Sequence, residues 1–163
     1  MIGRLAVFGL VSVLIACSPL AAESRQGLEL QRTEGAHFHY AGELSLDGVY
    51  SYHGPKDEIL GDRVCFFPAK EFTGFIPRDS NDHRDAWFCF RNTSKAKTIF
   101  AINTRLFDDP SVCSVTGAAT VRITNYMVDR TEGDVNDLAD LVKVAKESQP
   151  SIKRRSGKNG ECR

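Results

Sequence analysis

The sequence lacks the short motifs that identify common enzyme chemistries. It contains no Gly-x-Ser-x-Gly, no His-Glu-x-x-His and no phosphate-binding glycine loop. It also lacks an excess of charge of either sign, since 21 Lys and Arg residues balance 21 Asp and Glu residues. A dedicated nucleic-acid binder normally carries a strong basic excess. We therefore expect neither a recognisable enzyme nor a nucleic-acid-binding protein.

Long hydrophobic runs are scarce as well. The apolar stretch from Leu5 to Ala16 is only about a dozen residues long, which is too short to span a bilayer. It follows a short basic start that contains Arg4, and it ends at small residues just before Cys17. This arrangement is typical of a secretory signal, so the chain is expected to be exported.

The boundary of this signal carries a specific resemblance. The residues Leu14-Ile15-Ala16-Cys17 are similar to the lipobox of bacterial lipoproteins. The resemblance implies that residues 1–16 are removed and that the Cys17 thiol carries a diacylglycerol, giving a stable membrane anchor. Ser18, in place of Asp, implies an outer-membrane lipoprotein that faces the periplasm.

An ordinary secretory signal is the alternative reading. Cleavage would then fall after Ala21 or Ala22, and the residue three positions before the cut would be Pro19 or Leu20. Both fit the small-x-small rule for signal cleavage poorly. The lipoprotein reading is therefore preferred.

Four cysteines follow the signal, an even number that suits an oxidising compartment. They are Cys65, Cys89, Cys113 and Cys162. Three pairings are open, and we favour Cys65 with Cys89, because both lie in short aromatic strand-like runs, which leaves Cys113 with Cys162. Zinc is disfavoured, since no two cysteines have C-x2-C spacing.

The remaining chain divides into three parts. Residues 17–35 are polar with little periodicity, which predicts a flexible tether. Residues 36–148 contain the alternating patterns of a β-domain. Residues 149–163 form a basic tail, which a bond through Cys162 would hold to the domain.

Strand patterns dominate the first half of the β-domain. Leu44, Leu46, Tyr50 and Tyr52 share one parity, which predicts a long half-buried strand with a bend or bulge at Gly48. Two short strands follow at residues 63–67 and 86–91, separated by a polar loop that includes residues 73–85.

The second half adds one helix and one or two strands. Ala96, Ile99 and Phe100 recur at helical spacing behind a Ser or Thr cap in Asn92-Thr93-Ser94, which predicts a short helix. Residues 119–124 alternate cleanly and run on toward Val128 as a strand. Residues 134–146 fit a helix or a closing strand equally well. The order of three strands, a helix and two strands predicts a mainly β fold, a small five-stranded OB-like barrel with one short helix; an antiparallel β-sandwich is the alternative.

Two groups of polar residues have side chains of the kinds that bind metal ions. His37 and His39 lie on one side of an extended segment, but nothing brings His53 or His83 to them. The second group lies in one loop and supplies side-chain oxygens from Asp79, Asn81, Asp82 and Asp85. This loop lacks the glycine and the closing glutamate of a calcium-binding loop. We expect neither a metal nor another cofactor.

Aromatic residues provide the remaining candidates. An OB barrel often binds ligands over its second and third strands, and most aromatic residues there are expected in the core. Tyr50, Tyr52 and Trp87 are the best candidates for an exposed binding surface. The sequence thus favours a lipid-anchored, non-catalytic module that engages another envelope protein, as an inhibitor, an immunity protein or an assembly subunit. Glycan or oligonucleotide binding by the barrel face is the alternative, and an enzyme with an unrecognised site is the third.

Overall fold

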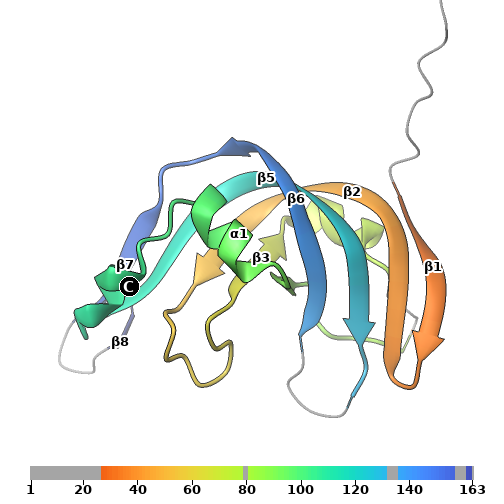
Figure 1. Cartoon of the computed structure of the whole chain (residues 1–163), viewed down its shortest axis with the longest axis horizontal. Coiled ribbons are helices and arrows are strands. Elements are labelled where there is room, and N and C mark those ends of the chain that lie inside the picture. The colour runs from red at the N-terminus through yellow and green to blue at the C-terminus, as the bar shows by residue number, and fades with distance from the viewer. Residues whose placement is uncertain (1–26, 79–80, 132–135, 157–160, 163) are drawn as a thin grey trace, which may run out of the picture.

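A computed structural model describes residues 27–78, 81–131, 136–156 and 161–162. Strands account for most of the described chain, with one short α-helix and two 3-10 helices (Figure 1). The elements are β1 (Gly27–Glu34), β2 (His37–Tyr52), β3 (Val64–Pro68), η1 (Lys70–Phe75), β4 (Phe88–Phe90), α1 (Thr93–Ile99), η2 (Thr104–Asp108), β5 (Val112–Asp129), β6 (Asp137–Glu147), β7 (Ser151–Ser156) and β8 (Glu161–Cys162).

Five of these strands close into a ring. The neighbours run β2-β3-β4-β6-β5, and β5 pairs back onto β2 along almost its whole length, from Tyr52 opposite Val115 to His37 opposite Asp129. Among the strand pairs of the described chain, β4 with β6 alone is parallel. The helix α1 lies in the chain between the third and fourth strands of the ring. The predicted five-stranded OB-like barrel with one short helix is therefore confirmed.

The barrel interior holds the alternating apolar residues. The predicted set on β2 is buried, since Leu46, Tyr50 and Tyr52 are fully inaccessible and Leu44 is 4 % exposed. The helix contributes Ala96, and Phe100 just after it stacks on Tyr50 with ring centres 4.1 Å apart. Burying each such side chain contributes roughly 1.5–3 kcal/mol, so this interior is the main source of stability.

Position 48 requires glycine because β2 and β3 lie very close together there, whereas the predicted bulge lies at another position of β2. A Cβ at Gly48 would lie 2.3 Å from the carbonyl oxygen of Phe67 on β3. The register with β5 is regular at Gly48 and shifts instead between Tyr40 and Glu43, where Gly42 has a positive φ of 108°. The long strand therefore bends at Gly42, and Gly48 lets β3 pack tightly.

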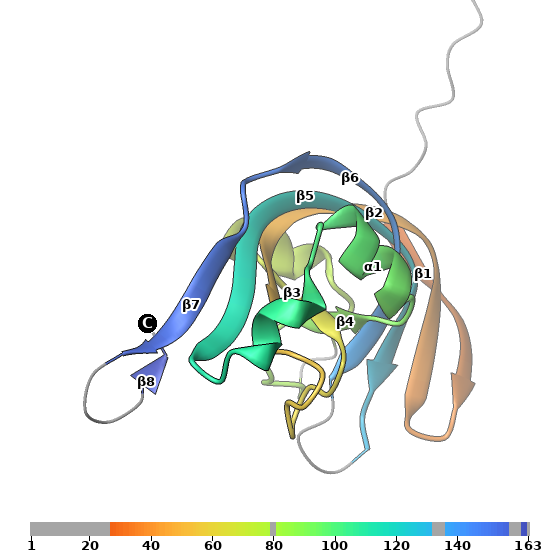
Figure 2. The same ribbon diagram turned by 60° about the vertical axis from the view of Figure 1, so that its left-hand side comes forward.

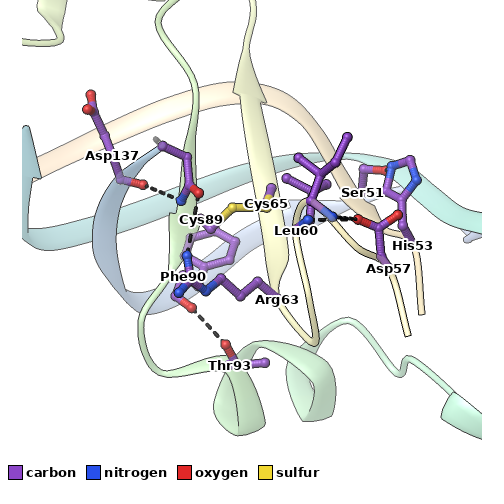
Figure 3. The surroundings of a disulfide bond; sticks show 12 residues. Ser51, His53, Asp57, Leu60, Arg63, Cys65, Cys89, Phe90, Thr93 and Asp137 are labelled. Atoms are coloured by element: carbon purple, nitrogen blue, oxygen red, sulfur yellow. Dashed lines mark hydrogen bonds between the residues drawn. A yellow bond between two sulfur atoms is a disulfide. The ribbon is translucent and has the colours of Figure 1, made fainter. Parts of the chain in front are cut away.

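The disulfide between Cys65 and Cys89 joins β3 to β4, as predicted. Both cysteines are fully inaccessible, and Leu60 of the loop after β2 lies near the bond (Figure 3). Cys113 is also disulfide-bonded. Its predicted partner is Cys162, whose side chain lies outside the described part of the structure, so that pairing stays a prediction.

Three further predictions change. Residues 27–34 form β1, which pairs with β2, so the flexible tether is wrong over that stretch; residues 17–26 lie outside the described residues. Residues 137–147 are the strand β6, which settles the open choice for 134–146. The basic tail contains β7, which pairs with the start of β5 and extends beyond the barrel (Figure 2).

The helix cap also differs from expectation. Asn92 is the N-cap, but its side chain makes no cap hydrogen bond. Its amide instead donates to the Leu141 carbonyl at 2.9 Å and accepts from the Leu141 N–H at 3.0 Å. The side chain therefore ties the start of α1 to β6.

Candidate functional site

An apolar band crosses β5, β2 and β3 on the outer face of the barrel and ends at the residue before β4. The strand registers place Ala118 of β5 opposite Val49 of β2, and Val49 opposite Phe67 of β3. Continuing the β3–β4 register by one residue brings Trp87, just before β4, beside Phe67. Val49 is 44 % exposed and Phe67 is 40 % exposed, whereas Trp87 is half-buried. We call these four residues the apolar band.

The aromatic end of the band is ordered by stacking. The rings of Phe67 and Trp87 are nearly parallel, at 15°, with centres 5.5 Å apart. Aromatic pairs of this kind contribute about 0.5–1.5 kcal/mol beyond their buried area. The pair therefore presents a rigid aromatic surface that needs little ordering when a partner binds.

Polar residues flank the band on both sides. On one side the hydroxyl of Thr120 donates to the exposed Asp47 carboxylate at 2.5 Å, and Lys146 lies next to Thr120 in the register. On the other side lies the half-buried Thr116, which pairs with the buried Ser51. Contiguous exposed apolar surface with a polar border is typical of binding sites on soluble proteins.

A hollow of about 620 Å³ opens beside the aromatic end of the band. Phe67 and Trp87 line it together with residues of η1 and of the loop before β4, including Lys70, Thr73 and Asp85. We call it the Trp87 hollow. Its volume lies in the range of small-ligand sites, roughly 300–1,000 Å³.

Beneath the Trp87 hollow lies a buried ion-pair network. Asp137 is 1 % exposed, accepts a 2.6 Å hydrogen bond from the Tyr126 hydroxyl and a 3.2 Å bond from the Asp129 N–H, and pairs with Arg78. The Arg84 guanidinium also lies 3.8 Å from Asp137. Because Arg78 and Arg84 come from the loop before β4, the network fixes that loop to β5 and β6.

Asp82 completes the network. Arg84 donates to both of its carboxylate oxygens, at 2.9 and 2.8 Å. These hydrogen bonds hold the pKa of Asp82 well below its usual range. Burial, together with the Asp137 carboxylate, raises the pKa of Tyr126 well above 10.0, so Tyr126 stays a neutral donor.

The predicted surface residues divide into two groups. Trp87 lies on the outer face, whereas Tyr50 and Tyr52 are fully inaccessible and belong to the core. Their parity with Leu44 and Leu46 turns both rings into the barrel, where they cannot contact a partner. Val49 and Phe67 take their place in the exposed surface. The sequence held one indication of this: Val49 is apolar, yet it alternates with the polar residues Ser45, Asp47 and Ser51 on the outer side of the strand.

The metal candidates have other roles. His37 contacts Asp129 and His39 contacts Glu34, each at 3.4 Å, while His53 is hydrogen-bonded to Ser51. In the acidic loop, the Asp82 carboxylate accepts hydrogen bonds from Arg84. The side chains of Asn81 and Asp85 are exposed, and Asp79 lies outside the described residues. Within the described ranges no three acidic, histidine or cysteine side chains form a group that could hold a metal ion.

The Ser51–His53 pair is the nearest approach to nucleophilic chemistry. The serine oxygen lies 2.8 Å from a ring nitrogen of the histidine, but Ser51 is only 5 % exposed. Asp57, drawn beside it in Figure 3, accepts hydrogen bonds from the backbone of Ile59 and Leu60. The pair therefore lacks both substrate access and an orienting carboxylate in the described structure.

A larger hollow of about 880 Å³ lies at the start of β5. The loop after β2, η2 and β7 border it. Its lining holds charged side chains of both signs, Lys56 and Arg155 against Asp57, Glu58 and Asp108. No group of one chemical type converges in it, so it defines no ligand.

Comparisons with protein-family models, curated proteins and solved structures find no match to this chain. None of the helices in the described segments is both long enough and apolar enough to cross a membrane. The fold and the surface are thus the basis for assigning a function.

Proposed function

We propose that this protein is a non-catalytic binding module of the bacterial cell envelope and that the apolar band contacts a protein partner. The observation that carries the proposal is the exposure of Val49 and Phe67 in register with Trp87 on one barrel face. Interfaces are enriched in aromatic residues, and a few of them supply most of the binding energy. The strands are about 4.8 Å apart, so the band is about 14 Å long, enough for an interface centre.

The anchoring part of the proposal rests on the sequence. Cys17 carries the lipid, residues 1–16 are removed, and the module acts on the periplasmic side of the outer membrane. Within this class the partner is a toxin, a cell-wall enzyme or a subunit of an envelope assembly. The disulfide between Cys65 and Cys89 supports export, because oxidised pairs are stable outside the reducing cytosol.

Photo-crosslinking in living cells tests the partner claim. A benzophenone amino acid is placed at position 67 in the band, and in a control strain at position 30 on β1, where Leu30 is 55 % exposed. The proposal expects one protein to be captured from position 67 and not from position 30. Equal capture from both positions, or none from position 67, would contradict it.

Mass spectrometry of the mature N-terminus tests the anchoring claim separately. The expected product begins at Cys17 with the added mass of the diacylglycerol and acyl groups. An unmodified chain that begins after Ala21 or Ala22 would show an ordinary secretory signal instead.

A further inference from the structure

We infer that the Trp87 hollow binds an uncharged carbohydrate, in addition to the protein partner proposed for the band. The first reason is the presence of Phe67 and Trp87 in its lining. Aromatic rings pack against the apolar ring faces of sugars, and stacking on each other holds these two side chains in place. The hollow also has the size of a small-ligand site.

The second reason is the balance of charge around the hollow. Arg84 is already bonded to Asp82 and to the Asp129 carbonyl, the latter at 2.7 Å, and Arg78 is paired with Asp137. Their positive charges are therefore neutralised by carboxylates beneath the hollow. An anionic ligand would gain little from them.

The remaining charged side chains are one of each sign. Lys70 and Asp85 both line the hollow and both are exposed. Lys70 is a donor only, the Asp85 carboxylate is an acceptor only, and Thr73 has a hydroxyl group that can do both. Vicinal sugar hydroxyls donate and accept at once, so they satisfy this mixed set, whereas a net charge on the ligand would meet a like charge on one side.

Trp87 is the only tryptophan in the chain, so its fluorescence reports directly on the hollow. The full-length protein is purified from membranes and titrated with the neutral trimer of N-acetylglucosamine. A parallel titration uses the anionic trimer of galacturonic acid. We expect a saturable fluorescence change with the neutral trimer and binding at least about tenfold weaker for the anionic one.

Variants assign the binding to the hollow. Trp87→Ala and Asp85→Ala should each weaken binding of the neutral trimer about tenfold, measured by calorimetry. Trp87→Phe keeps an aromatic face and should bind within about threefold of wild type. Leu30→Ala on β1 is the control and should change nothing. Asp85 is exposed, so its variant remains informative if Trp87→Ala does not fold.

Three results would overturn the inference. One is the absence of any signal up to about 10 mM neutral trimer, a concentration that reveals even a millimolar site. The second is tighter binding of the anionic trimer, and the third is binding that survives both Trp87→Ala and Asp85→Ala. The purified protein is tested without a protein partner, so these failures leave the crosslinking test of the proposed function unaffected.

Discussion

Replacing Asp137 with alanine should destabilise the protein strongly, because it removes the buried carboxylate that pairs with Arg78 and accepts a hydrogen bond from Tyr126. The carboxylate is 1 % exposed and interacts with Arg78, Arg84, Tyr126 and the Asp129 N–H. Removing one member of a buried ion pair costs about 3–5 kcal/mol. With a urea m-value of about 2 kcal/mol/M, the unfolding midpoint should fall by about 2 M.

Urea unfolding of the oxidised protein at pH 7 measures this effect. Asp47→Ala is the matched control, since Asp47 is exposed and its carboxylate accepts a surface hydrogen bond from Thr120; the change in unfolding free energy should stay within about 1 kcal/mol. The double variant with Arg78→Ala should be less destabilised than the sum of the single variants, with a coupling of about 1–3 kcal/mol. A change below about 1 kcal/mol for Asp137→Ala, or strict additivity, would refute the reasoning.

Three further predictions concern stability. Tyr50→Phe should be neutral or stabilising, since the Tyr50 hydroxyl is buried with no hydrogen-bond partner in the described structure. Tyr126→Phe removes a buried hydrogen bond to Asp137 and should cost about 1–3 kcal/mol in thermal or urea unfolding. The opposite order of the two variants would contradict this. Gly48→Ala should destabilise the protein by more than about 2 kcal/mol, because its Cβ would meet backbone and ring atoms of β3. The Cβ of Gly74→Ala would meet nothing within 4 Å, so this variant should be tolerated. Equal effects of the two variants on the melting temperature would contradict the close packing of Gly48 on β3. Folding lowers the pKa of Asp82, so the ionised carboxylate stabilises the folded state above the unfolded pKa of about 3.9, and this stabilisation is lost as the pH falls below that value. The unfolding free energy should therefore stay constant from pH 7 to about 5 and fall below about pH 4. The fall should be smaller in Asp82→Asn than in the wild type.

The central strand was predictable because one of its faces is buried. Leu44, Leu46, Tyr50 and Tyr52 alternate with polar residues, and that alternation is what a half-buried strand requires. The pairing of Cys65 with Cys89 followed from two short aromatic runs that had to lie side by side. Local patterns were sufficient at these positions.

The edge strands were not predictable from periodicity. β1 (Gly27–Glu34) has six exposed residues in succession, so neither of its faces leaves an apolar pattern. Its charged residues suit an unpaired edge, and they also made it resemble a tether. β7 (Ser151–Ser156) was read as a basic tail for the same reason.

The candidate site was only partly predictable. Trp87 lies on the outer face as expected, whereas Tyr50 and Tyr52, also expected at the surface, share the parity of the buried leucines and lie in the core. The apolar band depends on strand register, which a single sequence does not specify. The ion-pair network joins Arg78 to Asp137 across two elements, and no local motif connects residues so far apart in the chain.

The affinity of the crosslinked partner for a variant band is the most direct test of the proposed function. Calorimetry would compare the purified partner with wild-type protein, with Phe67→Ser and with Leu30→Ser as the exposed control on β1. The account predicts a loss of about 2 kcal/mol, roughly thirtyfold, for Phe67→Ser and wild-type affinity for Leu30→Ser. Unchanged affinity in Phe67→Ser would show that the apolar band is not the binding surface.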